Sequence, residues 1–369
     1  MSNTSKKIPV SYDNVPCYDI RLENHFDFIA TELSNFSLER RKIAIITDSN
    51  VGNFHVEHLK VVVSQITNQV FVSSFPAGEE NKNLMTVQSI YEFLIMNSFD
   101  RNDVLIALGG GVVGDLTGFV AATYLRGIRF FQVPSSLLAM VDSSIGGKTG
   151  VDFNSYKNMV GAFYMPSGVY MNLSTLHTLP QKEYLSGMGE VIKHGLIKDR
   201  NYYVSLKENV DHIVKKDIDY ILPMVARSCE IKREVVQNDP KELGERALLN
   251  FGHSIGHAVE KLMNFTLLHG ECVAIGMVAA SFISMQRNML TVEEFNDIKQ
   301  TIASFSLPVE LPGIHTESVL EVMKKDKKAD ANTIKFILLQ GIGNAIIDTT
   351  VSKEEMTKAI EYIAAKKGL

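Results

Sequence analysis

The sequence predicts an α/β N-terminal domain, Rossmann-like with a mostly parallel sheet, followed by a mainly α-helical C-terminal domain. Up to about residue 172, short apolar segments typical of strands alternate with helical segments, the order expected of a parallel sheet with crossover helices. From Pro180 to Ser304 the apolar residues instead follow helical periodicity. We therefore expect two domains, with residues 1–175 forming the α/β part and residues 176–369 the helical part.

The strands and helices are expected in the following order. Within 8–22, apolar Val10, Val15 and Ile20 stand among polar neighbours, which indicates a strand pair. Strands are expected at 42–47 and 70–74 with a helix between them, then a helix at 84–96, and further strands at 103–108 and 128–133. Near the end, strands at 333–339 and 345–348 are expected to precede a helix that starts at residue 353.

Composition limits the class of protein. With 369 residues, 45% apolar and 21% charged, the chain is long enough for a large buried core and typical of soluble globular proteins. A net charge of -5 without a basic block argues against a nucleic-acid partner. The 3 cysteines are far apart and in no metal or redox spacing, which favours a reducing, cytoplasmic setting. No signal peptide or membrane helix is expected.

A glycine-rich turn is the first candidate site. Gly109, Gly111 and Gly114 match G-x-G-x-x-G between an expected strand and an expected helix. Such a turn binds phosphate through backbone N–H groups and the positive end of the helix, although a tight structural turn is the alternative. The acid that usually binds the ribose is missing, because residues 116–141 contain no Asp or Glu. Asp48 or Glu79 is the natural substitute.

Histidines and a glutamate form a second candidate site. His253 and His257 are four positions apart, and Glu190 and Lys193 are three apart, so each pair shares a face if its segment is helical. His269 follows after an expected turn. Two histidines and one carboxylate are the usual ligands of a catalytic zinc-type ion. Spacing alone nominates both His253 and His257, and the alternative is that the histidines are ordinary hydrogen-bonded residues.

Basic residues gather near both motifs and suggest an acidic substrate that carries phosphate or carboxylate. They are Lys148, Lys157, Lys193, Lys232, Arg246, Lys327 and Lys328. Together, the glycine turn, the candidate metal ligands and these cations predict a metal enzyme that uses a dinucleotide on an anionic polyol.

Several long segments closely resemble the 3-dehydroquinate synthase family. They are residues 109–124, 132–150, 157–163, 187–195, 250–257 and 269–277. The resemblance implies a homodimer with an NAD-binding α/β domain (1–175) and a helical metal- and substrate-binding domain (176–369). It also implies conversion of the sugar acid phosphate DAHP (3-deoxy-D-arabino-heptulosonate 7-phosphate) to 3-dehydroquinate and phosphate in the shikimate pathway. NAD would act transiently, through oxidation, phosphate elimination, reduction and aldol closure, with one divalent ion, zinc or cobalt.

The resemblance also implies roles for individual residues. The metal ligands would be Glu190, His253 and His269, which replaces the pair suggested by spacing. Proton transfer and contacts to the substrate hydroxyls would involve His257, Glu242, Lys193 and Asp142. The substrate would be bound by Arg126 (from across a dimer interface), Lys148, Asn158, Lys232, Arg246, Asn250 and one of Lys327 and Lys328. NAD would be bound by Asp48, Glu79, Lys82, Gly110, Gly111, Val112, Asp115, Ser135, Ser136, Lys157, Thr175, Leu176 and Thr178.

Two other activities fit the same motifs. A related sugar phosphate cyclase would make another carbocycle, such as a valiolone or an inosose. A metal-dependent polyol dehydrogenase would share the two-domain plan but would accumulate NADH.

Overall fold

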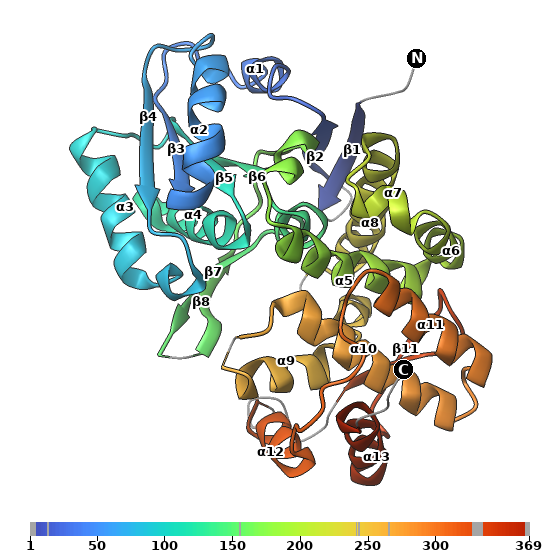
Figure 1. Cartoon of the computed structure of the whole chain (residues 1–369). Helices are drawn as coiled ribbons and strands as arrows, with labels where there is room; N and C mark the ends of the chain where they lie inside the picture. Colours follow the sequence, from blue (N-terminus) through green and yellow to red (C-terminus); the bar gives the residue numbers. More distant parts are fainter. Residues whose placement is uncertain are drawn as a thin grey trace. The chain divides into compact units, whose positions relative to one another are not determined.

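The computed structural model of the chain describes residues 5–12, 15–154, 156–240, 242, 244–264, 266–326 and 335–365. The chain divides into two compact units (Figure 1). The first contains the chain up to Pro180 together with Ile221–Arg233, and the second contains Gln181–Tyr220 and the chain from Glu234 onward. Helix α8 (Ile218–Asn238) therefore contributes its central residues to the first unit.

A seven-stranded sheet forms the centre of the first unit, in the order β1-β2-β9-β6-β5-β3-β4. The β1–β2 pair is antiparallel and every other neighbouring pair is parallel. The strands are β1 (Lys6–Tyr12), β2 (Val15–Glu23), β3 (Ile43–Asp48), β4 (Val70–Phe75), β5 (Val104–Gly109), β6 (Arg129–Pro134) and β9 (Gly168–Asn172). The predicted α/β class with a mostly parallel sheet is confirmed.

Helices cover both faces of this sheet, so its central strands carry apolar side chains on both sides. On one face α1 (Ile29–Ser34) and α2 (Ser49–Val63) pack against Ile43 and Ile45 of β3. On the other face α3 (Leu84–Met96) and α4 (Gly111–Thr123) pack against Ala44 and Ile46. Successive β3 residues thus belong to opposite cores, as the pleat of a strand requires.

Three elements of the first unit were not among the expected ones. They are α1, β9 and an antiparallel ribbon of β7 (Lys148–Phe153) and β8 (Tyr156–Phe163). The two strands contain seven apolar residues and seven glycine or polar residues without regular alternation, so the segment has no strand signature.

The second unit is mainly helical, as predicted. Its helices are α5 (Gln181–Lys198), α6 (Arg200–Glu208), α7 (Val210–Val214), α9 (His253–Leu262), α10 (His269–Gln286), α11 (Val292–Ser304), α12 (Thr316–Asp326) and α13 (Lys353–Ala364). A short antiparallel pair, β10 (Phe336–Leu339) and β11 (Ala345–Asp348), completes it. No helix in the described part of the chain is both long and apolar enough to cross a membrane.

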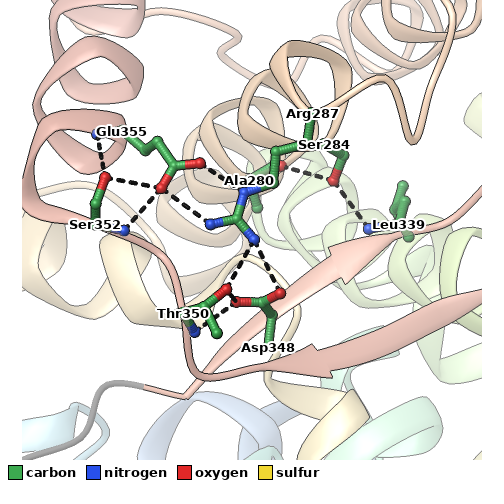
Figure 2. Close-up of polar contacts among 8 residues, drawn as sticks. All are labelled: Ala280, Ser284, Arg287, Leu339, Asp348, Thr350, Ser352 and Glu355. Atoms are coloured by element: carbon green, nitrogen blue, oxygen red, sulfur yellow. Dashed lines mark hydrogen bonds and ion pairs between the residues drawn. The ribbon is translucent and has the colours of Figure 1, made fainter.

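The end of α10 is tied to the C-terminal segment by Arg287 (Figure 2). Its guanidinium donates to both carboxylate oxygens of Glu355 at 2.6 and 2.9 Å, and to Asp348 Oδ2 at 2.9 Å. Ser284 adds a second connection, because its hydroxyl accepts from the Leu339 N–H at 3.0 Å. These bonds fix α10 against β10, β11 and the start of α13.

Candidate functional site

Glu190 is the centre of a buried polar cluster in the second unit. It lies in α5 with a fully buried side chain, and Lys193, one turn later on the same helix, forms an ion pair with Glu190 Oε2. The other oxygen, Oε1, is buried and accepts no hydrogen bond from the residues that the structure describes. A buried carboxylate oxygen without a hydrogen bond is costly, so this position favours a hydrogen-bond donor or a cation beside it.

Two imidazole nitrogens point at that oxygen. The Nε2 atoms of His253 and His269 each lie 3.5 Å from Glu190 Oε1. In both rings Nδ1 faces an oxygen on the opposite side, which is the Phe251 carbonyl at 3.1 Å for His253 and Glu260 Oε1 at 3.9 Å for His269. An N–H at Nδ1 leaves Nε2 with a free electron pair, so both rings present a metal-binding nitrogen to the same point.

The charges of the cluster suit a cation. Burial raises the pKa of Glu190, but the Lys193 ammonium and the neighbouring imidazoles outweigh burial and hold that pKa well below its usual range. Burial and the Lys193 charge lower the pKa of His253 well below its usual value, which keeps this imidazole neutral. Burial also opposes the charged form of His269, yet the carboxylates of Glu190 and Glu260 raise its pKa to about 9, so a metal ion that binds Nε2 would displace a proton from this ring.

Glycines bring the three helices of the cluster close together. A Cβ on Gly270, the residue after His269, would lie 1.8 Å from the Ser186 carbonyl oxygen of α5. A Cβ on Gly276 would lie 1.9 Å from the carbonyl oxygen of Gly252, the N-cap residue of α9. The backbones of α5, α9 and α10 therefore meet directly, and this contact places Glu190 beside both histidines.

Other predicted residues of the second unit lie on α9 and in the segment before it. His257 is exposed, with its ring centroid 5.0 Å from that of His253 and 6.0 Å from that of His269. Glu242 accepts a hydrogen bond from Asn250 Nδ2 at 3.1 Å, just before α9 begins. Buried Arg246 donates from its guanidinium to the Pro240 carbonyl at 2.8 Å. Lys327 and Lys328 lie outside the described residues.

In the first unit, the predicted cofactor residues follow the carboxyl ends of neighbouring parallel strands. Asp48 ends β3, Gly110 follows β5, and Ser135 and Ser136 follow β6. Glu79 and Lys82 come after β4, and Thr175, Leu176 and Thr178 after β9. Since these strands are adjacent and parallel, their following loops lie along one edge of the sheet, where α/β folds bind ligands.

The glycine turn starts α4 without a side-chain cap. Gly110 is the N-cap residue of α4 and provides no side-chain cap, and Gly111 and Val112 begin the helix. The first N–H groups of a helix have no intrahelical partner, so here they remain available to a ligand oxygen. By contrast, the neighbouring α2 is capped by Asp48, whose Oδ1 accepts from the Asn50 and Val51 N–H groups at 2.8 and 2.9 Å.

Lys82 joins this edge to the β7–β8 ribbon. Its buried ammonium lies 2.7 Å from Asp115 Oδ2 on α4 and 2.5 Å from Asn158 Oδ1 on β8. Asn158 has a left-handed backbone with φ 54°, and its N–H donates to Asp152 Oδ1 at 2.7 Å. Lys157 pairs with Glu79 at 3.8 Å. Residues expected around the dinucleotide and the phosphate thus form one connected network.

The remaining predicted residues of the first unit fall into two places. Lys232 of α8 is buried and forms an ion pair with Asp142 Oδ1 at 2.5 Å, so two residues that are 90 positions apart meet. Lys148 and Arg126 are exposed. Leu125 and Arg126 both have left-handed backbones, with φ 51° and 65°.

One cavity and one residue stand apart from the sequence predictions. A cavity of about 460 Å³ lies between α1 and the β1–β2–β9 part of the sheet, and no predicted site residue lines it.

Glu260 was not predicted, yet it is buried behind His269. The sequence contains one indication of this position. Glu260 lies seven residues after His253, and on a helix this spacing places both residues on the same face.

Comparisons with known proteins agree with this architecture. Family models described as 3-dehydroquinate synthase N-terminal and C-terminal match residues 72–186 and 187–329, respectively. The 3-dehydroquinate synthase of Acetivibrio thermocellus is 46% identical over 319 residues, which cover 86% of this chain and 89% of the relative. That of Ruminiclostridium cellulolyticum is 43% identical over 343 residues, covering 93% and 95%.

The fold of the chain is also similar to that of a solved structure. The 2-epi-5-epi-valiolone synthase from Streptomyces hygroscopicus subsp. jinggangensis 5008, with NAD+ and Zn2+ bound, aligns with a TM-score of 0.88 at 25% identity. The alignment covers 97% of this chain and 99% of that one.

The sheet unit, the helical unit and the Glu-His-His cluster define the class of sugar phosphate cyclases. Within that class the matches are specific. Both family regions occur in order, and a relative with 46% identity covers most of the chain. The chain belongs to the 3-dehydroquinate synthase family, which confirms the resemblance seen in the sequence motifs.

Proposed function

We propose that this chain converts DAHP to 3-dehydroquinate and phosphate, with NAD bound by the first unit and one divalent metal ion bound by the second. The proposal keeps the expected domains, with residues 1–175 for NAD and residues 176–369 for the metal ion and substrate. The observation that carries the proposal is the convergence of His253 Nε2 and His269 Nε2 on the buried Oε1 of Glu190. The reaction itself is inferred from membership in the 3-dehydroquinate synthase family.

The residues fit a metal ion of the zinc or cobalt type. Their donor atoms, one carboxylate oxygen and two imidazole nitrogens, lie within 4.8 Å of one another. This mixed set leaves a coordination position for substrate, as in catalytic zinc sites, and also suits cobalt. When bound, the ion would acidify a substrate hydroxyl and polarise the corresponding ketone.

The first unit fits a dinucleotide. The uncapped N–H groups after Gly110 suit a pyrophosphate, and Asp48 and Glu79 supply carboxylates at the same sheet edge for ribose hydroxyls. When bound, NAD would supply reversible hydride transfer at the substrate alcohol, with no net formation of NADH. The proposal includes the cofactor-binding residues assigned above to the pyrophosphate and the nicotinamide.

Residues of this chain would bind the substrate and move protons. Lys193 holds Glu190 ionised and has further N–H groups for a substrate hydroxyl. His257 is exposed beside the two proposed ligands, where it can exchange a proton with substrate or solvent. Glu242 is oriented by Asn250 for the second proton transfer. Lys148, Lys232 and Arg246 would neutralise the phosphate and carboxylate groups, and Asn158 would donate a hydrogen bond from its side-chain amide to the phosphate.

The proposal includes a homodimer in the cytoplasm, with Arg126 contributed to the partner's site. Its exposed side chain supports a residue that is available to a second subunit. Mixing an inactive Arg126→Ala protein with an inactive His257→Ala protein tests this assignment. We expect mixed dimers to recover activity, whereas no recovery after verified subunit exchange would contradict it.

Phosphate release is the direct test of the activity. Purified protein with NAD and Zn²⁺ or Co²⁺ is expected to release phosphate from DAHP and to form 3-dehydroquinate without net NADH. Sedoheptulose 7-phosphate as the better substrate would instead indicate a related cyclase. Accumulation of NADH with a simple polyol would indicate a dehydrogenase.

A further inference from the structure

Glu260 is a buried carboxylate directed at the far side of His269. It lies in α9 with 6% of its surface exposed, and its Oε1 is 3.9 Å from His269 Nδ1. His253, His257 and Glu260 occupy positions i, i+4 and i+7 of this helix, so one stripe of α9 faces the start of α10.

The two nitrogens of His269 therefore face two different carboxylates. Nε2 is directed to Glu190 and Nδ1 to Glu260. His253 also has an oxygen behind it, because its Nδ1 contacts the Phe251 carbonyl at a hydrogen-bond distance of 3.1 Å, whereas the Glu260 carboxylate lies 3.9 Å from His269 Nδ1 as an ion pair. An acceptor at Nδ1 favours the tautomer whose proton is on that nitrogen, and it makes Nε2 a better electron donor to a metal ion.

We propose that Glu260 is a positioning residue that fixes the tautomer and ring orientation of His269 and thereby strengthens metal binding. This inference rests on the proposed metal site. Glu260 itself would not contact the ion, since it faces Nδ1 of His269, which is the nitrogen opposite the one that faces Glu190.

A second group of three residues could also hold a metal ion and competes with the Glu190 group. In this competing arrangement, His257, Glu260 and His269 have donor atoms within 4.8 Å of one another. Two observations favour the Glu190 arrangement over it. Glu190 Oε1 is buried without a hydrogen bond from the described residues, whereas His257 is exposed.

The test is cobalt affinity and the visible spectrum of the cobalt-loaded protein, measured for wild type, Glu260→Gln and Glu260→Ala. Outer carboxylates of this kind typically contribute about 10–100-fold to metal affinity. We expect the dissociation constant to rise about 10-fold in Glu260→Gln, whose amide oxygen can still accept from Nδ1, and about 100-fold in Glu260→Ala. The cobalt bands should shift in the same order.

A matched variant separates positioning from general stability. Asp297 of α11 accepts from Tyr203 Oη at 2.8 Å and pairs with Lys207, away from the cluster. Asp297→Asn should lower the melting temperature and leave cobalt affinity unchanged.

Three results would overturn the inference. The first is unchanged affinity and spectrum in both folded Glu260 variants. The second is retained cobalt binding in Glu190→Gln together with its loss in Glu260→Ala, which would place the ion at the competing arrangement. The third is a wild-type protein that binds no cobalt, which would also remove the metal from the proposed function.

Discussion

Lys82 and Asp115 form a buried ion pair, with 2.7 Å between Nζ and Oδ2, that links the loop after β4 to the first turns of the helix behind the glycine turn. Burial alone would lower the pKa of Lys82. The Asp115 carboxylate outweighs this effect, so the pKa of Lys82 is raised above its usual value. The ammonium therefore stays charged and can hold Asn158 on the β7–β8 ribbon as well. One cation thus organises residues from three separate segments around the proposed dinucleotide site.

Removing this cation should weaken both stability and NAD binding. Lys82→Met leaves Asp115 buried without its partner, and breaking a buried pair in this way costs about 3 kcal/mol. We expect a lower free energy of unfolding and an approximately tenfold weaker NAD affinity, measured by chemical denaturation and by calorimetric titration.

Two further variants control this prediction. Lys42 donates to the Asn97 and Ser98 carbonyls in the same unit, so Lys42→Met should lower stability but leave NAD affinity intact. Adding Asp115→Asn to Lys82→Met should restore part of the lost stability. Equal NAD affinity in Lys82→Met and wild type would contradict the proposed role.

Gly276 sets the distance between α10 and the N-terminal end of α9. The methyl group of Gly276→Ala would lie 1.9 Å from the Gly252 carbonyl oxygen, so α9 and the His253 side chain must move. Overpacking of this kind costs about 1–3 kcal/mol, and we expect cobalt affinity to fall with stability. In the control Gly52→Ala, the added methyl first meets a Thr47 methyl at 3.2 Å. A Gly276→Ala protein with wild-type cobalt affinity would count against this packing argument.

The Arg287–Glu355 pair gives a pH dependence of stability (Figure 2). Hydrogen bonds from Arg287 outweigh the opposing effect of burial and lower the pKa of Glu355 to about 2. A carboxylate with a depressed pKa in the folded state stabilises the protein above its unfolded pKa of about 4.3, and this contribution disappears as pH falls towards 2.

Arg287→Met should therefore lower the free energy of unfolding by about 1–2 kcal/mol at pH 7, after allowance for partial solvent exposure. The difference from wild type should shrink between pH 5 and pH 2, as measured by urea denaturation at each pH. Exposed Lys324 of α12 provides a charge-matched control, because Lys324→Met should show no such pH-dependent difference. A constant difference for Arg287→Met across this range would exclude the linkage.

Metal removal should abolish activity reversibly. We expect dialysis against a chelator to reduce phosphate release from DAHP at least 100-fold, and Co²⁺ or Zn²⁺ to restore it, because the ion supplies charge stabilisation worth several kcal/mol. Glu190→Gln should remain inactive after metal is added, with circular dichroism to verify folding. Full activity in metal-free protein would contradict the proposal.

Most of the fold could be predicted from local pattern. The helix at 84–96 and the strand at 345–348 have the predicted bounds, because strong periodicity and clear flanking residues define them. The β7–β8 ribbon could not be predicted, since its strands are defined by pairing with each other rather than by alternation within either one.

The site was predictable only in part. Spacing could relate His253 to His257 but not to Glu190, because backbone contact between α5, α9 and α10 brings Glu190 and the histidines together. The family resemblance supplied that grouping, and metal binding by it remains a prediction. The sequence could not indicate a role for Glu260, because that role depends on which nitrogen of His269 the carboxylate faces.

The central claim is that Glu190, His253 and His269 bind one ion. Anomalous diffraction at the cobalt edge from crystals of the Co²⁺-loaded protein tests it most directly. We predict a single strong peak within coordinating distance of Glu190 Oε1 and both Nε2 atoms, which is lost in His253→Ala. A peak among His257, Glu260 and His269, or no peak at saturating Co²⁺, would contradict the account.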